Sequence, residues 1–231
     1  MSIAQALESV RRRIAQAAAQ SDRDAGDVKL IAVSKTQAAA AVREAYAAGQ
    51  RDFGENYVQE LLQKAEELRD LRDLRWHFIG HLQRNKAKQV APIAALVHTV
   101  DGIDLARELA KRFAAVATDR RLPVLVEVSI AGEAQKHGVA PENLAELLTG
   151  IEALPELRLQ GLMCVPPFTE DAAAARPHFD ALSRLRELQG GARRLPDLSM
   201  GMTSDLEHAV AAGATLVRVG TAIFGARAAK A

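Results

Sequence analysis

The chain has 231 residues, of which 48% are hydrophobic and 4% are aromatic. This length and apolar content allow a sizeable core and exclude a disordered polymer. The 30 basic and 29 acidic residues give a formal net charge of +1, which argues against a nucleic-acid partner and against an anionic membrane surface. No apolar run approaches the ~18 residues that a membrane span needs.

The one cysteine and the first residues of the chain bear on its compartment. Cys164 has no partner for an internal disulfide, which fits a reducing environment, and its apolar neighbours predict a small buried hydrophobe. Segment 1–13 has no apolar stretch after its basic residues, so it does not resemble a secretory signal. We therefore expect a cytoplasmic protein.

Short apolar runs rich in β-branched residues alternate with longer stretches of helical period. After a helix predicted over 3–20, strands are predicted over 28–34, 51–53, 75–80, 96–100, 123–130, 159–165, 197–200 and 216–219. Helices between them are predicted over 38–48, 55–69, 85–90, 104–118, 142–153, 171–188 and 205–212, and a short turn follows Thr221.

Turn residues support these boundaries. Gly49 and Gly213 follow Ala-rich helices and are expected to take the left-handed cap conformation, and the glycine pair at 190–191 ends another helix. Thr203 or Ser204 is expected to cap the helix that begins near residue 205.

Eight strand–helix units without a linker predict one domain, residues 1–231, that forms a closed (β/α)8 barrel of the TIM type with an extra N-terminal helix. A doubly wound open sheet is the alternative, and the count of eight favours the barrel. Ligands of such barrels bind at the carboxyl ends of the strands, so the residues that end each strand are the candidates for chemistry.

The first strand ends at Lys35. A lysine there can be an ordinary solvated residue, or it can be an amine held at an apolar barrel mouth. Desolvation lowers the pKa of such an amine and frees it to attack a carbonyl group.

The last two strands lead into segments typical of a phosphate site. The loop after strand seven, with Ser199 and Gly201, runs into a helix N-terminus, where backbone amides and the helix dipole favour an anion. Strand eight ends in Gly220, which allows close backbone approach, and Thr221, which offers a hydroxyl. These two loops are the usual phosphate site of the fold, although ordinary turn chemistry also accounts for such residues.

Strand one neighbours strand eight in a closed barrel, so Lys35 is expected beside this phosphate cradle. An amine and a phosphate site together suit pyridoxal phosphate, and they also suit a sugar phosphate in an aldolase-like site. Arg218 is expected on the same side of its strand as Gly220. A guanidinium only donates hydrogen bonds, so beneath a pyridine ring it would keep the ring nitrogen unprotonated. A structural salt bridge is the alternative role for Arg218.

Other polar residues are weaker candidates. His77 and His81 lie four residues apart, a spacing that suits a metal only on a helix. Their segment is predicted to be a strand followed by a loop, so no metal site is predicted. Three basic residues form a small patch with the charge to attract an anion, namely Arg84, Lys86 and Lys88. Lys136 and His137 lie in a polar loop, 132–138, which is most simply a solvated one.

Six ordered blocks of the sequence resemble the family of pyridoxal phosphate homeostasis proteins, over roughly residues 3–227. The blocks are VSKT at 33–36, FGENYVQE at 53–60, WHFIGHLQRNK at 76–86, GLM at 161–163, LSMGM at 198–202 and VRVGTAIFG at 217–225. The sequence departs from the usual family pattern at Gln37-Ala38, at Ser129 and at Thr203, which leaves the residues of the cofactor site in place.

The resemblance implies a barrel like the N-terminal domain of alanine racemase, with pyridoxal 5′-phosphate as cofactor. It implies that Lys35 forms a Schiff base with the cofactor and that Arg218 faces the pyridine nitrogen. The phosphate cradle it implies consists of Ser199, Gly201, Gly220 and Thr221, and the residues it places near the cofactor are Asn56, Met163 and Met200.

Proteins of this family carry the cofactor and regulate its level, so the resemblance implies a role in intracellular pyridoxal phosphate homeostasis, by buffering or delivery. Two enzymatic alternatives stay open, namely an amino-acid racemase and a Schiff-base aldolase. The racemases supply a tyrosine from a second domain, and this chain stops soon after strand eight with only Tyr46 and Tyr57. We therefore expect a monomeric carrier that is not an enzyme, with apo forms of pyridoxal phosphate enzymes as recipients.

Overall fold

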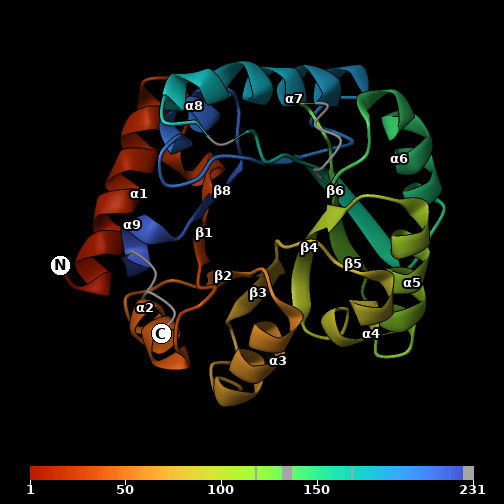
Figure 1. Ribbon diagram of the computed structural model, residues 1–231, viewed down its shortest axis with the longest axis horizontal. Coiled ribbons are helices and arrows are strands. Elements are labelled where there is room, and N and C mark those ends of the chain that lie inside the picture. The colour runs from red at the N-terminus through yellow and green to blue at the C-terminus, as the bar shows by residue number, and fades with distance from the viewer. Residues whose placement is uncertain (118, 132–136, 168, 226–231) are drawn as a thin grey trace.

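Eight parallel strands form a closed barrel in the order β1 to β8 in the computed structural model, which describes residues 1–117, 119–131, 137–167 and 169–225 (Figure 1). The strands are β1 (Lys29–Val33), β2 (Asp52–Glu55), β3 (Arg75–Phe78), β4 (Ala94–Val100), β5 (Leu122–Glu127), β6 (Leu157–Met163), β7 (Asp197–Ser199) and β8 (Leu216–Val219). The predicted barrel is confirmed. The open-sheet alternative is wrong because β1 pairs with β8, from Lys29 opposite Leu216 to Ala32 opposite Val219.

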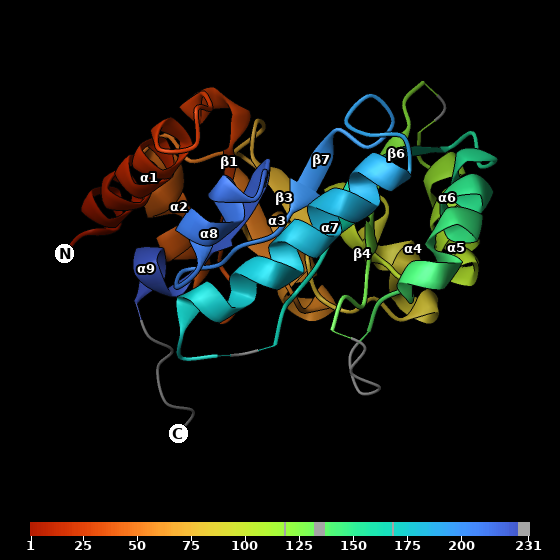
Figure 2. The same ribbon diagram turned by 90° about the horizontal axis from the view of Figure 1, so that it is seen from above.

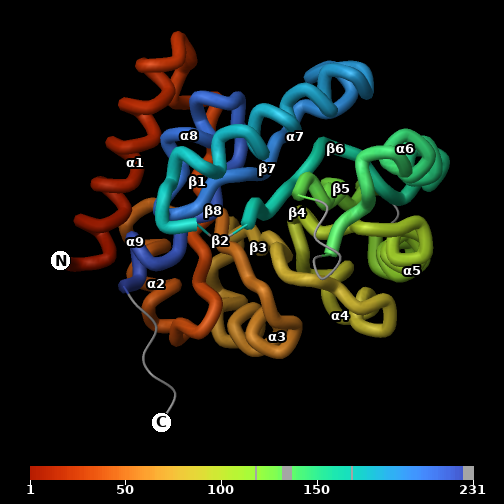
Figure 3. Tube along the Cα trace, turned by 45° about the horizontal axis from the view of Figure 1, so that its top comes forward, coloured from red at the N-terminus to blue at the C-terminus, as the bar shows by residue number. Residues whose placement is uncertain are grey.

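Helices surround the barrel (Figures 1 and 2). They are α1 (Ile3–Ala19), α2 (Ala39–Ala47), α3 (Val58–Glu67), α4 (Ala87–Val90), α5 (Ile103–Ala114), α6 (Leu144–Glu152), α7 (Arg176–Leu188), α8 (Leu206–Ala211) and α9 (Thr221–Phe224). The extra helix α1 packs against α8 and α9, so segments from the two ends of the chain lie side by side (Figure 3). Its buried face carries Leu7, Val10 and Ile14, spaced by one and two helical turns.

The alternation of side chains along each strand creates two apolar regions. Side chains that point outward, such as Leu30 and Ala32, pack beneath the helices in the larger cluster. Side chains that point inward form a small cluster inside the barrel, which consists of Ile31, Leu96, Leu125, Met163 and Leu216. The interior also contains buried polar residues, which are described below.

Some predicted boundaries are wrong for identifiable reasons. Residue 55 was expected to start a helix, but Glu55 ends β2 and α3 begins at Val58. Neither Thr203 nor Ser204 caps α8. Asp205 is the N-cap residue instead, and its carboxylate accepts a hydrogen bond from the Met202 amide, which closes the loop before the helix.

The predicted glycine caps are confirmed, because Gly49 and Gly213 have φ angles of 86° and 97°. Helix α5 ends at Ala114, and Thr118, the last residue of the helix predicted there, lies outside the described residues. Within the described part of the chain, no helix is both long enough and apolar enough to cross a membrane.

Candidate functional site

Lys35 lies in a tight turn that follows β1. The Gln37 amide donates to the Ser34 carbonyl oxygen at 3.0 Å, and this bond closes the turn around the half-buried Lys35. Thr36 has a φ angle of 64°, in the left-handed region that β-branched residues rarely adopt. Strain of this kind persists only where the surroundings enforce it, and it often marks a functional site.

A buried ion cluster enforces the turn. Lys64 Nζ donates to the Ser34 carbonyl oxygen at 2.7 Å, to Glu55 Oε1 at 2.7 Å and to Glu60 Oε2 at 2.9 Å. Ser34 Oγ donates to Glu55 Oε1 at 2.7 Å, and the Thr36 amide donates to Glu60 Oε2 at 2.7 Å. We refer to Ser34, Glu55, Glu60 and Lys64 as the Lys64 cluster.

Burial raises the pKa of Glu55, and the hydrogen bond and charge of Lys64 oppose this shift. The Lys64 cluster does not follow from the sequence pattern, which predicts a helix from residue 55 onward. The only local signal was the spacing of Glu60 and Lys64, which lie four residues apart on one helix.

The ends of β1 and β8 meet at close range. A β-carbon on Gly220 would lie 3.2 Å from the Val33 carbonyl oxygen, and a β-carbon on Gly201 would lie 2.5 Å from Ala209 Cβ. Gly201 also has a φ angle of 91°, so the loop after β7 requires glycine, whereas at Gly220 a larger residue would be tightly packed against β1. The Ala222 amide approaches Thr203 Oγ1 at 3.5 Å and thereby joins the loops after β7 and β8.

Arg218 is buried inside the barrel, just below this pair of loops. Its Nη1 donates to Ser199 Oγ at 2.6 Å, and its Nη2 donates to the Cys164 carbonyl oxygen at 2.9 Å. Cys164 is buried as predicted, and burial raises the pKa of its thiol to about 12. The guanidinium is therefore held by two acceptors that carry no formal charge.

Ser199 and Met200, two of the predicted cofactor residues, have their contacts away from the glycine loops. The Ser199 hydroxyl lies inside the barrel between Arg218 and His98, with His98 Nδ1 at 2.8 Å, so it does not face the glycine loops. The Met200 side chain points outward and is fully buried in the larger apolar cluster, because it follows Ser199 by one position along the strand. Thr221, by contrast, is exposed at the start of α9.

Two further predicted residues lie at the same end of the barrel. Met163 ends β6 and belongs to the inner apolar cluster. Asn56 follows β2, and its Oδ1 is buried and has no donor among the described residues. Gly80 permits this arrangement, since a β-carbon there would lie 2.1 Å from the Asn56 carbonyl oxygen. An orphaned buried oxygen at a barrel mouth indicates a place for a ligand donor or for water.

Glu127 ends β5 and was not among the predicted site residues. Burial raises its pKa to about 7, repulsion from Asp101 adds to the shift, and Arg218 opposes it. Three charged side chains from β5, β8 and the loop after β4 thus influence one another at the mouth.

The remaining candidates lie away from the interior or outside the described residues. His81, Asp101 and His137 approach within 4.8 Å of one another, but the two imidazole rings are stacked, with centroids 3.5 Å apart and an interplanar angle of 8°. No single ion can lie in both ring planes in this arrangement, as metal–imidazole bonds require. Lys136 lies outside the described residues.

The patch of Arg84, Lys86 and Lys88 belongs to a short helical segment that includes α4. Arg84 and Lys88 are exposed and Lys86 is half-buried. These residues form a surface feature and contribute no side chain to the barrel interior.

A lysine, a buried guanidinium, an orphaned amide oxygen and two glycine loops therefore share the carboxyl ends of the strands. This set fits a small ligand that carries an amine-reactive carbonyl, a ring acceptor and a phosphate. Fold and site together define a barrel protein of the alanine racemase N-terminal type, and the family described as "Alanine racemase, N-terminal domain" matches residues 6–228.

Curated relatives narrow this assignment. The chain is 49% identical over 226 residues to the pyridoxal phosphate homeostasis protein of Pseudomonas aeruginosa, with 97% of this chain and 96% of the relative covered. It is 42% identical over 231 residues to that of Escherichia coli K12, with 97% of each covered. The chain belongs to the family of pyridoxal phosphate homeostasis proteins.

Solved structures agree with this assignment. The structure of PipY from Synechococcus elongatus with PLP bound has a TM-score of 0.84 at 40% identity, and the match covers 97% of this chain and 100% of that one. Alanine racemase from Corynebacterium glutamicum has a TM-score of 0.67 at 16% identity, and the match covers 96% of this chain and 62% of that one. The racemase shares the fold alone.

Proposed function

We propose that this protein binds pyridoxal 5′-phosphate at the barrel mouth, holds it as a Schiff base on Lys35, and serves to buffer and deliver the cofactor inside the cell. The main support for this proposal is the strained turn that places Lys35 beside the glycine loop of β8. The names of the relatives and the PLP-bound PipY structure support the same ligand.

Each part of the ligand has a counterpart in the site. When bound, the cofactor supplies an aldehyde for the Lys35 amine, a pyridine nitrogen and a phosphate. Arg218 would donate to the ring nitrogen, because a guanidinium has only donors to offer. The backbone amides of Gly201 and Gly220, with the Thr203 and Thr221 hydroxyls, would hold the phosphate, while Asn56 and Met163 would border the ring.

The proposed role is that of a carrier and not of a racemase. Racemisation needs an acid–base group on each face of the substrate α-carbon, and Lys35 can serve only one face. The Tyr46 hydroxyl is hydrogen-bonded to Asp73 on the outside of the barrel, and Tyr57 is 55% exposed in the segment before α3. An unprotonated pyridine nitrogen opposite Arg218 would also stabilise a carbanion poorly.

The proposal extends to assembly and partners. A carrier of this kind would act as a cytoplasmic monomer and would pass its cofactor to apo enzymes that require it. The relatives' names describe homeostasis and no turnover, which supports a carrier.

The test begins with absorption spectra before and after addition of pyridoxal phosphate. Reduction with borohydride followed by peptide mass spectrometry should find the cofactor on Lys35, and Lys35→Ala should abolish the visible band. Lys86→Ala is the matched control and should behave as wild type. Attachment solely to Lys86 or Lys136 would contradict the proposal.

A second measurement separates carrier from racemase. The loaded protein should restore activity to a cofactor-free recipient enzyme. Chiral analysis with L- and D-alanine should show no exchange above that of Lys35→Ala. Robust exchange that is lost in Tyr57→Phe would favour the racemase.

A further inference from the structure

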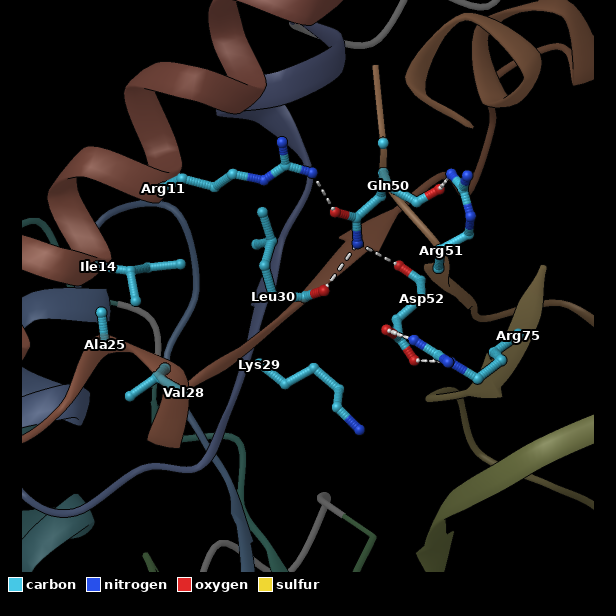
Figure 4. A pocket seen from close by; sticks show the side chains of 11 residues that line it. Arg11, Ile14, Ala25, Val28, Lys29, Leu30, Gln50, Arg51, Asp52 and Arg75 are labelled. Carbon is cyan, nitrogen blue, oxygen red and sulfur yellow. Dashed lines mark hydrogen bonds and ion pairs between the residues drawn. The ribbon is translucent and has the colours of Figure 1, made fainter. Parts of the chain in front are cut away.

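A row of hydrogen-bonded side chains begins at the amino-terminal end of the barrel. Arg75 Nε and Nη2 donate to the two carboxylate oxygens of Asp52 at 2.8 and 2.7 Å, beside a pocket of about 310 Å³ (Figure 4). Asp52 Oδ1 lies 2.9 Å from His77 Nε2, and His77 Nδ1 lies 2.9 Å from His98 Nε2. Asp52, His77 and His98 are all buried.

The row continues to the mouth. His98 Nδ1 lies 2.8 Å from Ser199 Oγ, which accepts the 2.6 Å hydrogen bond from Arg218 Nη1. Strands β2, β3, β4, β7 and β8 each supply a member. We call this set, from Asp52 through His77, His98 and Ser199 to Arg218, the Asp52–Arg218 row. It crosses the barrel interior and connects a surface ion pair at one end with the proposed ligand site at the other.

With both imidazoles neutral, the Asp52 end of the row determines the direction of the hydrogen bonds in it. Arg218 has only donors, and an ionised Asp52 only accepts. Burial alone would raise the pKa of Asp52, but hydrogen bonds from His77 and Arg75 hold it well below its usual range. Asp52 therefore accepts a hydrogen bond from the His77 Nε2–H group.

The remaining bonds follow in sequence. With its proton on Nε2, His77 accepts at Nδ1 from His98 Nε2, so His98 accepts at Nδ1 from the Ser199 hydroxyl. The Ser199 oxygen is then the acceptor that Arg218 needs. Each member has one consistent role, and both imidazoles are neutral.

The charges around the imidazoles agree with this state. Burial lowers the pKa of His77, and the nearby cations Lys29 and Arg75 add to the effect while Asp52 opposes it. Burial lowers the pKa of His98 well below its usual value, with further contributions from His77, Arg218 and Lys29. Neither ring is expected to gain a proton near neutral pH.

We propose that the Asp52–Arg218 row is a positioning device, which holds the Arg218 guanidinium in one orientation toward the ligand and keeps both imidazoles protonated on Nε2 alone. Reversal of the row is unfavourable because His77 Nε2 would then face the ionised Asp52 carboxylate as acceptor against acceptor, and the Ser199 hydroxyl proton would lose His98 as its acceptor. The role of the row in ligand binding rests on the proposed function. The tautomers of His77 and His98 are a property of the ligand-free protein.

The first test concerns the ligand-free protein. Long-range ¹⁵N–¹H correlation spectra of ¹⁵N-labelled protein should show His77 and His98 neutral and protonated on Nε2 between about pH 6 and pH 8. Ser199→Ala should change the Nδ1 signal of His98, which loses its donor. An imidazolium, or a proton on Nδ1 of either ring in the wild type, would overturn the proposal.

The second test measures the dissociation constant and the absorption maximum of bound pyridoxal phosphate. Ser199→Ala should raise the dissociation constant about tenfold and shift the maximum, because Arg218 loses an acceptor. Asp52→Asn should weaken binding in the same direction from the opposite end of the barrel.

Matched controls separate this effect from general destabilisation. Ser183→Ala removes a hydroxyl that bonds to the Ala212 carbonyl on the outer layer, and Asp197→Asn changes a carboxylate at the amino-terminal end of β7 that is bonded to Thr215. Both controls should bind within about twofold of wild type. Equal losses in the controls, or unchanged affinity in both row variants, would overturn the positioning role. If wild type binds no pyridoxal phosphate, the proposed function fails, and the NMR result still decides the state of the row.

Discussion

A β-carbon on Gly220 would lie 3.2 Å from the carbonyl oxygen of Val33 and 3.4 Å from its Cβ, so the ends of β8 and β1 are in direct backbone contact. The proposed phosphate loop and the Lys35 turn are therefore set at one fixed separation. A β-carbon at position 220 would require Val33 to shift by a few tenths of an ångström.

Gly220→Ala should weaken pyridoxal phosphate binding and lower the free energy of unfolding by about 1–3 kcal/mol, because the added methyl group overpacks this contact. Titration by absorbance and urea denaturation measure the two effects. Gly102→Ala is the control, since a β-carbon there meets nothing within 4 Å. Unchanged binding in Gly220→Ala would show that the separation of the two strand ends does not matter for the ligand.

Lys64→Met should destabilise the protein by about 3–5 kcal/mol, because it leaves the buried Glu55 carboxylate without its cation. Adding Glu55→Gln should recover part of this loss, since the uncompensated charge is then removed. Denaturant unfolding of both variants checks the prediction, and the exposed Lys111→Met serves as control. If the double variant is no more stable than Lys64→Met, the ion pair does not account for the loss.

Thr221→Val should raise the dissociation constant of pyridoxal phosphate by about one to two decades, since hydrogen bonds to a charged group contribute roughly 1.5–3 kcal/mol. Pyridoxal, which lacks the phosphate, should bind poorly to wild type and equally to the variant. Thr149→Val, on the exposed face of α6, should have no effect. Equal affinity of wild type for the two ligands would exclude the proposed cradle.

Glu127 should make stability depend on pH. Its pKa is raised to about 7 in the folded protein from an ordinary value of 4.5, so the folded state favours the neutral acid. Stability contributed by this group is present below about pH 4.5 and is lost as the pH rises through about 7, by up to about 3 kcal/mol. Urea midpoints across this range should fall more steeply in wild type than in Glu127→Gln. Identical slopes would contradict the raised pKa.

The sequence by itself predicted the eight strands and the barrel, and it selected Lys35 and Arg218 as candidates from their positions at strand ends. Each of these inferences depends on local periodicity or on the position at a strand end, and such signals lie within a few neighbouring residues. The inward direction of Arg218 also follows from alternation along β8, since it lies two positions before Gly220.

Only the tertiary structure decided which partners those residues have. Ser199 has the expected strand position, yet its hydroxyl contacts His98, which is 101 positions away in the sequence, and Arg218 across the β7–β8 pair. The Lys64 amine likewise reaches the Ser34 carbonyl across 30 positions. Contacts of this kind depend on closure of the barrel, which brings the inward side chains of separate strands within hydrogen-bonding distance, and no periodic pattern along the chain encodes that distance.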